Sequence, residues 1–298
     1  MRVGMVILPE YRWWVAEPKW QAVERYGFDH AWTYDHLGWR SLVDGPWFGA
    51  VPTLTAAALA TERIGLGTMV ASPHFRHPVS FAREITTLDD MADGRLLLGV
   101  GAGARTGFDT TVLGGAPLTD RALVDRFAEF LELLDAILVN DRTTWQGSHY
   151  TAVDARSAPG CVRRPRVPFV VAANGPRSIR LVARFGQGWV TSGPRTENDD
   201  EWWAGVAERA ERLDTALAEA ERPSHTVRRY LSLDSSPTYS LTSTACFTDM
   251  LGKAARLGFT DVISHWPRAE GVYAGHESVV EEIAADVLPT LPGHSRTT

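Results

Sequence analysis

Short apolar runs alternate along this chain with longer segments whose hydrophobic residues recur at helical spacing. The short runs predict buried strands at Val3–Leu8, His30–Thr33, Ile64–Val70, Arg95–Val100, Phe169–Ala172, Gly188–Thr191, Thr226–Leu233 and Asp261–His265. The amphipathic segments predict helices at Pro18–Tyr26, Phe48–Thr61, Pro78 to a stop at Gly94, Asp120–Leu138, Pro176–Phe185, Glu201–Ala220, Thr248–Leu257 and Glu277–Leu288. About eight strand–helix units predict an α/β fold, a single closed (β/α)₈ TIM barrel, although periodicity alone leaves an open doubly wound sheet as the alternative.

One stretch interrupts the alternation. Residues Asn140–Pro168 are rich in proline, arginine and small polar residues, so we expect an insertion after the fourth β/α unit. No glycine- and serine-rich linker divides the chain, so we expect one barrel domain at residues 1–291. The last residues, 292–298, are predicted to be a frayed C-terminal tail.

Composition narrows the class of protein. The 298 residues are 44% hydrophobic and 22% charged, which is typical of a globular protein with a large core. A net charge of -6 disfavours nucleic acid as a partner, and no apolar run approaches the roughly 20 residues of a membrane span. The first residues resemble a strand more than a signal peptide, two distant cysteines favour a reduced cytoplasmic protein, and no cysteine–histidine spacing indicates a metal site. We therefore expect a cytoplasmic protein with a small-molecule substrate and no nucleic-acid or membrane partner, and a homodimer stays open.

Polar residues gather directly after the predicted strands, where a barrel carries its active site. Asp35 and His36 follow the second strand and suggest an acid–base pair, or alternatively a helix cap beside a surface histidine. His74, Arg76 and His77 follow the third strand. They are candidate ligands or proton donors, and the alternative is hydrogen-bonded scaffolding.

Two further loops offer backbone groups. Gly101–Gly103 follows the fourth strand and predicts either a tight turn or a bare backbone surface against which a flat cofactor lies. Asn174–Arg177 opens a helix after the fifth predicted barrel strand, where N–H groups and a cation suit a phosphate. Ordinary helix starts share these features, so the residues alone leave both interpretations open.

Several segments together resemble the luciferase-like flavin and deazaflavin oxidoreductases. The similar residues are Arg76-His77-Pro78, Thr87-Leu88-Asp89, Asp93-Gly94-Arg95, Leu98-Gly99-Val100-Gly101-Ala102-Gly103, Ala172-Ala173-Asn174-Gly175-Pro176-Arg177, Gly188-Trp189-Val190 and Leu257-Gly258-Phe259-Thr260-Asp261-Val262. Each segment is short, but their combination is specific and extends over most of the chain. Asp35-His36 resembles the deazaflavin branch, which includes the coenzyme F420-dependent glucose-6-phosphate dehydrogenases.

The resemblance implies an oxidoreductase that transfers a hydride between coenzyme F420 and a small organic substrate, with flavin mononucleotide (FMN) as the alternative cofactor. It implies that His36 faces the hydride-transfer centre. The cofactor-binding residues that it implies are Asp35, Met69, Val70, Ala102, Gly103, Ala172, Ala173, Asn174 and Gly175. Met69 and Val70 would be joined by a cis peptide bond behind the deazaflavin ring.

Two positions depart from the dehydrogenase pattern. A glutamate expected after the Gly-x-Gly turn is replaced by Ala104, and the nearest carboxylate is the displaced Asp109. A lysine that would hold a sugar phosphate is replaced by Pro194, next to Arg195. Glucose 6-phosphate is therefore disfavoured as the substrate. The alternative functions are an FMN-dependent monooxygenase that uses dioxygen and a non-catalytic flavin-binding protein.

Overall fold

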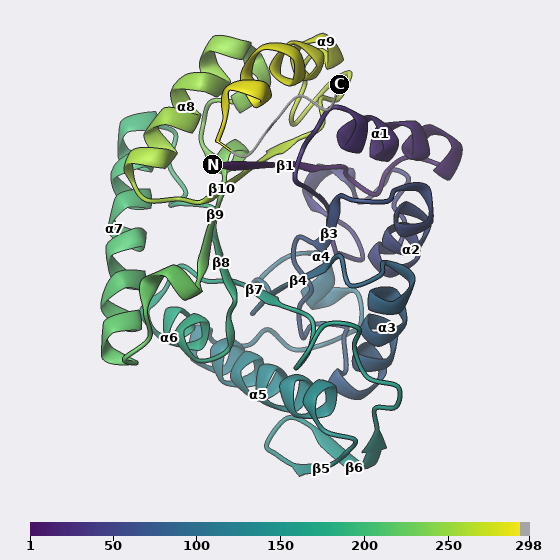
Figure 1. Ribbon diagram of the computed structural model, residues 1–298. Helices are drawn as coiled ribbons and strands as arrows, with labels where there is room; N and C mark the ends of the chain where they lie inside the picture. Colours follow the sequence, from purple (N-terminus) through teal and green to yellow (C-terminus); the bar gives the residue numbers. More distant parts are fainter. Residues whose placement is uncertain (293–298) are drawn as a thin grey trace. The chain divides into compact units, whose positions relative to one another are not determined.

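The computed structural model describes residues 1–292. Its main sheet is a closed parallel barrel with the strand order β1-β10-β9-β8-β7-β4-β3-β2 (Figure 1). The strands are β1 Arg2–Val6, β2 His30–Thr33, β3 Gly65–Thr68, β4 Leu96–Gly101, β7 Phe169–Ala172, β8 Gly188–Thr191, β9 Arg228–Ser232 and β10 Asp261–His265. The predicted (β/α)₈ barrel is confirmed, and β2, β7, β8 and β10 have the bounds that the sequence predicts.

Helices follow the strands where the amphipathic segments predict them. They are α1 Trp13–Arg25, α2 Ala50–Ala60, α3 Pro78–Met91, α5 Asp120–Val139, α6 Pro176–Phe185, α7 Asp199–Glu219, α8 Thr244–Arg256 and α9 Glu277–Glu282, with a short turn, α4, at Phe108–Thr111. Several predicted helix bounds differ from the observed ones, and α8, for example, begins four residues before the predicted Thr248. α1 begins at Trp13 and contains Pro18, which removes one backbone hydrogen bond without ending the helix. The last predicted helix ends early and continues as a π-helical turn at Ile283–Val287.

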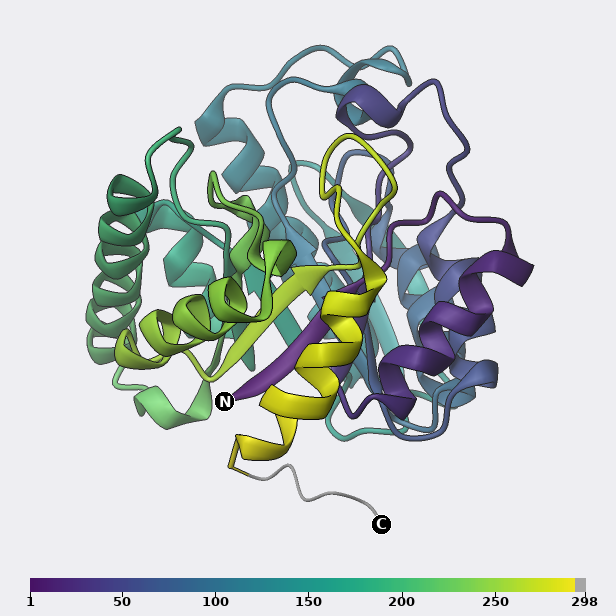
Figure 2. The same ribbon diagram turned by 90° about the horizontal axis from the view of Figure 1, so that it is seen from above.

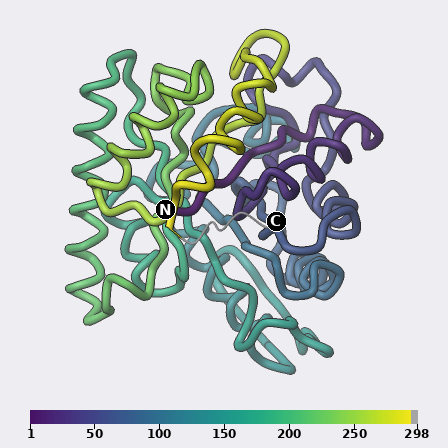
Figure 3. Tube along the Cα trace, turned by 45° about the horizontal axis from the view of Figure 1, so that its top comes forward, coloured from purple at the N-terminus to yellow at the C-terminus, as the bar shows by residue number. Residues whose placement is uncertain are grey.

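The residues between α5 and β7 contain two strands that the sequence patterns do not predict. β5 (Arg142–Gln146) and β6 (Thr151–Arg156) form an antiparallel two-stranded sheet. Figure 3 shows this hairpin beside α5. Glu129 of α5 anchors its turn, because the carboxylate accepts hydrogen bonds from the backbone N–H groups of His149 and Tyr150 at 2.9 and 2.8 Å.

Two compact units make up the described chain, and each is considered by itself. The first comprises Met1–Leu8, Pro18–Trp32 and the chain from Ala173 onward. In it, β1 pairs with β10 and β2, and β9 pairs with β10 and β8, all in parallel. Figure 2 shows α7, α8 and α9 along these strands, and α6 packs against α7.

The second unit comprises Pro9–Glu17 and Thr33–Ala172. In it, β4 pairs with β3 and β7, and α3 packs against α2 and α5. The apolar stripe predicted for α5 is buried, and its buried residues are Leu123, Phe127, Phe130, Leu131, Leu133, Leu134, Ile137 and Leu138. Burial of this face fixes α5 and therefore the position of the polar residues that the same helix carries.

A buried histidine–aspartate pair lies in the first unit, at the amino ends of β2 and β10. Trp32 Nε1–H donates to His30 Nδ1 at 2.7 Å, so the ring proton is on Nε2, which donates to Asp261 at 3.1 Å. Burial lowers the pKa of His30, which keeps the ring neutral. Burial alone would raise the pKa of Asp261, but the hydrogen bond from His30 holds it below its usual value. Because the amino-end face of a barrel serves stability, we assign this pair to the fold.

Gly4 of β1 is the point where the backbone approaches His30 most closely. A Cβ atom at Gly4 would lie 1.8 Å from His30 Nδ1. We expect Gly4→Ala to lower the free energy of unfolding by about 1–3 kcal/mol, because a buried ring that is hydrogen-bonded on both nitrogens has little room to move. Urea denaturation measures this change.

Gly45→Ala is the matched control for this experiment, since its Cβ would meet no atom closer than 3.5 Å. We expect this control to keep wild-type stability. A Gly4→Ala protein as stable as the control would contradict the packing of His30 against β1.

Candidate active site

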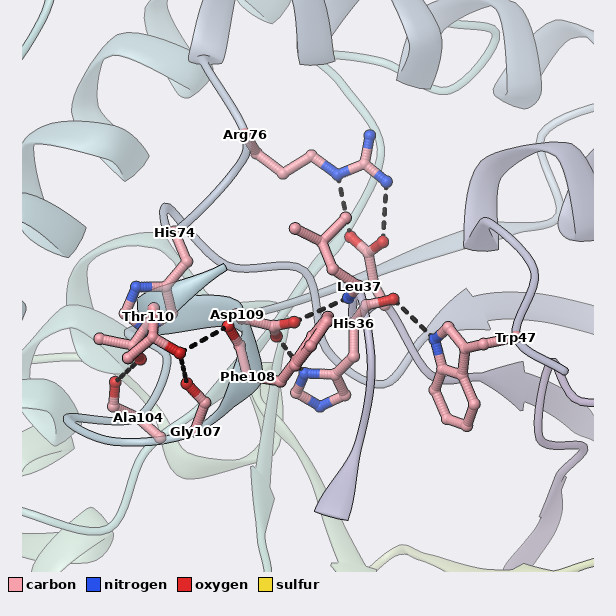
Figure 4. Close-up of polar contacts among 12 residues, drawn as sticks. His36, Leu37, Trp47, His74, Arg76, Ala104, Gly107, Phe108, Asp109 and Thr110 are labelled. Carbon is pink, nitrogen blue, oxygen red and sulfur yellow. Dashed lines mark hydrogen bonds and ion pairs between the residues drawn. The ribbon is translucent and has the colours of Figure 1, made fainter. Parts of the chain in front are cut away.

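Asp35 and His36 follow β2, at the strand end where a barrel builds its active site. Asp35 is 2% exposed, and its carboxylate accepts hydrogen bonds from Arg76 Nε at 3.1 Å and Nη2 at 2.7 Å (Figure 4). Burial raises the pKa of the Asp35 carboxyl, and the guanidinium opposes that rise. Arg76 also bonds to Glu84 of α3. The geometry therefore gives Arg76 a scaffolding role that ties the loop after β3 to the end of β2.

His36 is held by Asp109, which comes from α4. His36 Nδ1 lies 2.5 Å from Asp109 Oδ2, and the Leu37 N–H donates to Asp109 Oδ1 at 2.7 Å (Figure 4). Trp47 Nε1–H donates to the backbone carbonyl of His36 at 2.7 Å. The Asp109 side chain is 9% exposed and that of His36 is 30% exposed. A carboxylate on Nδ1 favours the tautomer with the proton there, which leaves Nε2 of the partly exposed ring as the acceptor.

A second histidine, His74, packs against the bare backbone of Gly103. Gly103 has a φ of 79°, and a Cβ atom there would lie 2.2 Å from His74 Nε2. Arg126 Nη2 of α5 donates to His74 Nδ1 at 2.9 Å, since a guanidinium only donates. Burial and then the Arg126 charge lower the pKa of His74, and the Ala104 carbonyl partly opposes them. His74 is therefore a neutral ring between the Gly-x-Gly turn and α5.

Met69 and Val70, at the end of β3, are joined by a cis peptide bond, which confirms the geometry that the family resemblance implies. Both residues are partly exposed. A Cβ atom at Gly101 would lie 2.8 Å from Val70 Cγ2 and 3.3 Å from the Ala172 Cβ. Val70, Gly101 and Ala172 thus form a small apolar ledge, and the absence of a side chain at Gly101 is what keeps it open.

Asn174 and Gly175 belong to the first unit, between β7 and α6. Thr191 Oγ1 at the end of β8 donates to Asn174 Oδ1 at 2.6 Å. Gly175 is the N-cap of α6, and no side chain caps this helix. A Cβ atom at Gly175 would meet nothing closer than Ser178 Oγ at 3.9 Å. The first N–H groups of α6 are therefore approachable by an anion.

The predicted site residues are divided between the two units. The second unit holds Asp35, His36, Met69, Val70, Ala102, Gly103 and Ala172, and the first holds Ala173, Asn174 and Gly175. His77 is scaffolding, because its ring accepts from the Val79 N–H at 3.3 Å and caps α3. Sequence reasoning noted Asp109 only as a displaced carboxylate and missed Arg126, which belongs to no motif.

Residues 1–292 contain neither a metal-binding cluster of side chains nor a membrane-spanning helix. Within residues 1–292, no group of three or more histidine, cysteine, aspartate or glutamate side chains is arranged to hold a metal ion. No helix in that range is long and apolar enough to cross a membrane.

Known proteins similar to this chain share its fold and part of its sequence. A family model described as luciferase-like monooxygenase matches residues 20–245. The F420-dependent glucose-6-phosphate dehydrogenase of Beutenbergia cavernae is 31% identical, over 92% of this chain and 92% of its own. The F420-dependent hydroxymycolic acid dehydrogenase of Mycobacterium tuberculosis is 32% identical, over 64% of this chain and 52% of its own. The coenzyme F420-dependent tetrahydromethanopterin reductase of Methanopyrus kandleri has a similar fold, with a TM-score of 0.75 at 16% identity over 97% of this chain and 98% of its own.

Proposed function

Because the chain belongs to the luciferase-like monooxygenase family, we propose that it is an oxidoreductase that transfers a hydride between coenzyme F420 and a small organic substrate. Relatives over much of its length are named as F420-dependent dehydrogenases. The observation that carries the proposal is the His36–Asp109 pair after β2. Oxidation of an alcohol by hydride transfer needs a group that takes the hydroxyl proton, and a histidine held by a carboxylate suits that task.

The second unit has a surface that suits a flat ring, and the first unit has one that suits a phosphate. The apolar ledge of Val70, Gly101 and Ala172 would take a ring face, because no side chain stands on Gly101. The uncapped start of α6 would take an anion, because backbone N–H groups and the helix dipole favour negative charge there.

We assign the cofactor contacts accordingly. The ring contacts are proposed for Met69, Val70, Ala102, Gly103 and Ala172, and the phosphate contacts for Ala173, Asn174 and Gly175. Asp35 would contact the cofactor through the carboxylate lone pairs that its Arg76 pair leaves over. F420, when bound, supplies the position that accepts or donates the hydride.

His36 handles the proton that accompanies the hydride. As a substrate alcohol is oxidised, the hydride leaves the carbon, His36 Nε2 takes the hydroxyl proton, and a carbonyl forms. In the reverse direction the protonated ring returns that proton. Asp109 is a positioning residue, because it holds Nδ1 and stabilises the positive charge that the ring gains. It offers a carboxylate to a site where Ala104 stands in place of the expected glutamate.

Cofactor binding tests the proposal directly. We expect F420 to bind at least about tenfold more tightly than FMN, a difference of about 1.4 kcal/mol. The expectation rests on Asp35-His36 and Met69-Val70, which resemble the deazaflavin branch in sequence. Fluorescence-quenching titrations of the purified apoprotein with each cofactor measure both dissociation constants. Tight FMN binding without F420 binding would favour a monooxygenase and overturn the proposal.

A further inference from the structure

A cavity of about 250 Å³ adjoins the His36–Asp109 pair within the second unit. Asp109 and Thr110 of α4 line it, together with His74, Arg126 and the apolar side chains of Leu113 and Leu118. Its volume equals roughly eight water molecules at about 30 Å³ each, which suits a small organic molecule. Because Asp109 also holds His36, a ligand in this cavity lies next to the proton-transfer pair.

Arg126 brings a positive charge to this cavity without a matching negative partner. Its Nη2 donates to His74, its Nε has no hydrogen-bond partner among residues 1–292, and no ion pair joins it to a carboxylate in that range. Nearby Tyr150 adds no charge, because burial raises the pKa of its phenol to about 12. Burial of a cation without an anionic partner costs free energy, and an anion bound in the cavity would offset that cost.

His74 orients the guanidinium. Since its Nδ1 accepts from Arg126, its proton is on Nε2, which is buried against the backbone of Gly103 and does not face the cavity. The carboxylate of Asp109 is already engaged, with one oxygen on His36 and the other on the Leu37 N–H. These hydrogen bonds weaken the electrostatic repulsion between the Asp109 carboxylate and an anion bound in the cavity. The cavity wall thus offers the Arg126 guanidinium as a donor, together with the Asp109 carboxylate that holds His36.

We propose that this cavity binds a substrate carboxylate, with Arg126 donating to it, while a hydroxyl or carbonyl group of the same molecule extends past Asp109 to His36. The substrate class is then a short hydroxy acid or the corresponding oxo acid. A planar guanidinium suits a carboxylate because it donates through two parallel N–H groups. Naming the ligand as a substrate rests on the proposed hydride transfer, whereas the anion site itself does not.

Binding to the apoprotein tests the anion site without the cofactor. The probes are 2-hydroxy-3-methylbutanoate and its neutral counterpart 3-methylbutane-1,2-diol, titrated by calorimetry at constant ionic strength. We expect the acid to bind at least about tenfold more tightly than the diol. Arg126→Gln should remove that preference, and Arg126→Lys should keep part of it. Arg121→Gln is the matched control, because Arg121 is on the same helix with 86% of its side chain exposed.

Each outcome of these titrations either supports or overturns carboxylate binding at Arg126. Equal binding of the acid and the diol, or the same preference in folded Arg126→Gln and wild-type protein, overturns it. Weaker F420 binding by Arg126→Gln with unchanged acid binding also overturns it, because the charge then serves the cofactor. Acid binding that depends on Arg126 in a protein that does not bind F420 supports the anion site and removes the proposed function instead.

Discussion

His36→Ala should lower turnover by about 10²–10⁴-fold while leaving F420 affinity within a few-fold of wild type. The imidazole is bound through Nδ1 to Asp109, and its partly exposed ring leaves Nε2 for the substrate. Removing it takes away the proton acceptor but leaves the ledge at Val70 and Gly101 intact. Single-turnover rates and F420 dissociation constants of the variant separate the two effects.

His77→Ala is the matched control for the histidine experiment. His77 also follows β3 in sequence, but its ring caps α3 through the Val79 N–H. We expect this variant to lose some stability and to turn over normally. If His36→Ala also turns over normally, His36 is scaffolding, and the proton must come from Asp109, His74 or water.

Gly175→Val should weaken F420 binding by at least about tenfold. Gly175 precedes the uncapped first turn of α6, and a branched side chain there would obstruct a phosphate that approaches the N–H groups. The substitution suits the fold, because the backbone is extended at φ −96° and ψ 159° and the nearest atom to a Cβ is 3.9 Å away. Fluorescence titration of the folded variant with F420 measures the loss.

Gly252→Val in α8 controls for the exchange of glycine for valine. A Cβ atom there would meet only the Arg256 guanidinium, at 3.5 Å. We expect its F420 affinity to equal that of the wild type. An unchanged affinity in folded Gly175→Val would show that the cofactor phosphate binds elsewhere in the chain.

The barrel could be predicted because its strands are short, largely buried and followed by amphipathic helices. β7 and β10, for example, are runs of buried residues bounded by turns, so their limits are visible in the sequence. β5 and β6 escaped prediction for the opposite reason. Most of their residues are exposed and polar, so no apolar period marks them. Their anchor is a tertiary contact with Glu129 of α5, which no local pattern reveals.

The sequence likewise predicts some residues of the candidate site and misses others. Asp35 and His36 could be found because a barrel places its active residues after its strands. Their partners could not, because the contact of His36 with Asp109 joins residues 73 positions apart, and that of Arg126 with His74 joins residues 52 positions apart. Arg126 was also hard to single out because the apolar stripe of α5 already explains why that helix packs on the barrel, and Arg126 is not part of the stripe.

Asp109 is presented by the short α4 turn inside the long connection from β4 to α5, several residues beyond the Gly-x-Gly turn. The partner of the proposed catalytic histidine is therefore carried by a loop segment and not by a barrel strand. The family resemblance implies a glutamate where this chain has Ala104, so a comparison of that single position would overlook Asp109. A change in this one loop can therefore change the carboxylate that holds His36 while the barrel strands stay the same.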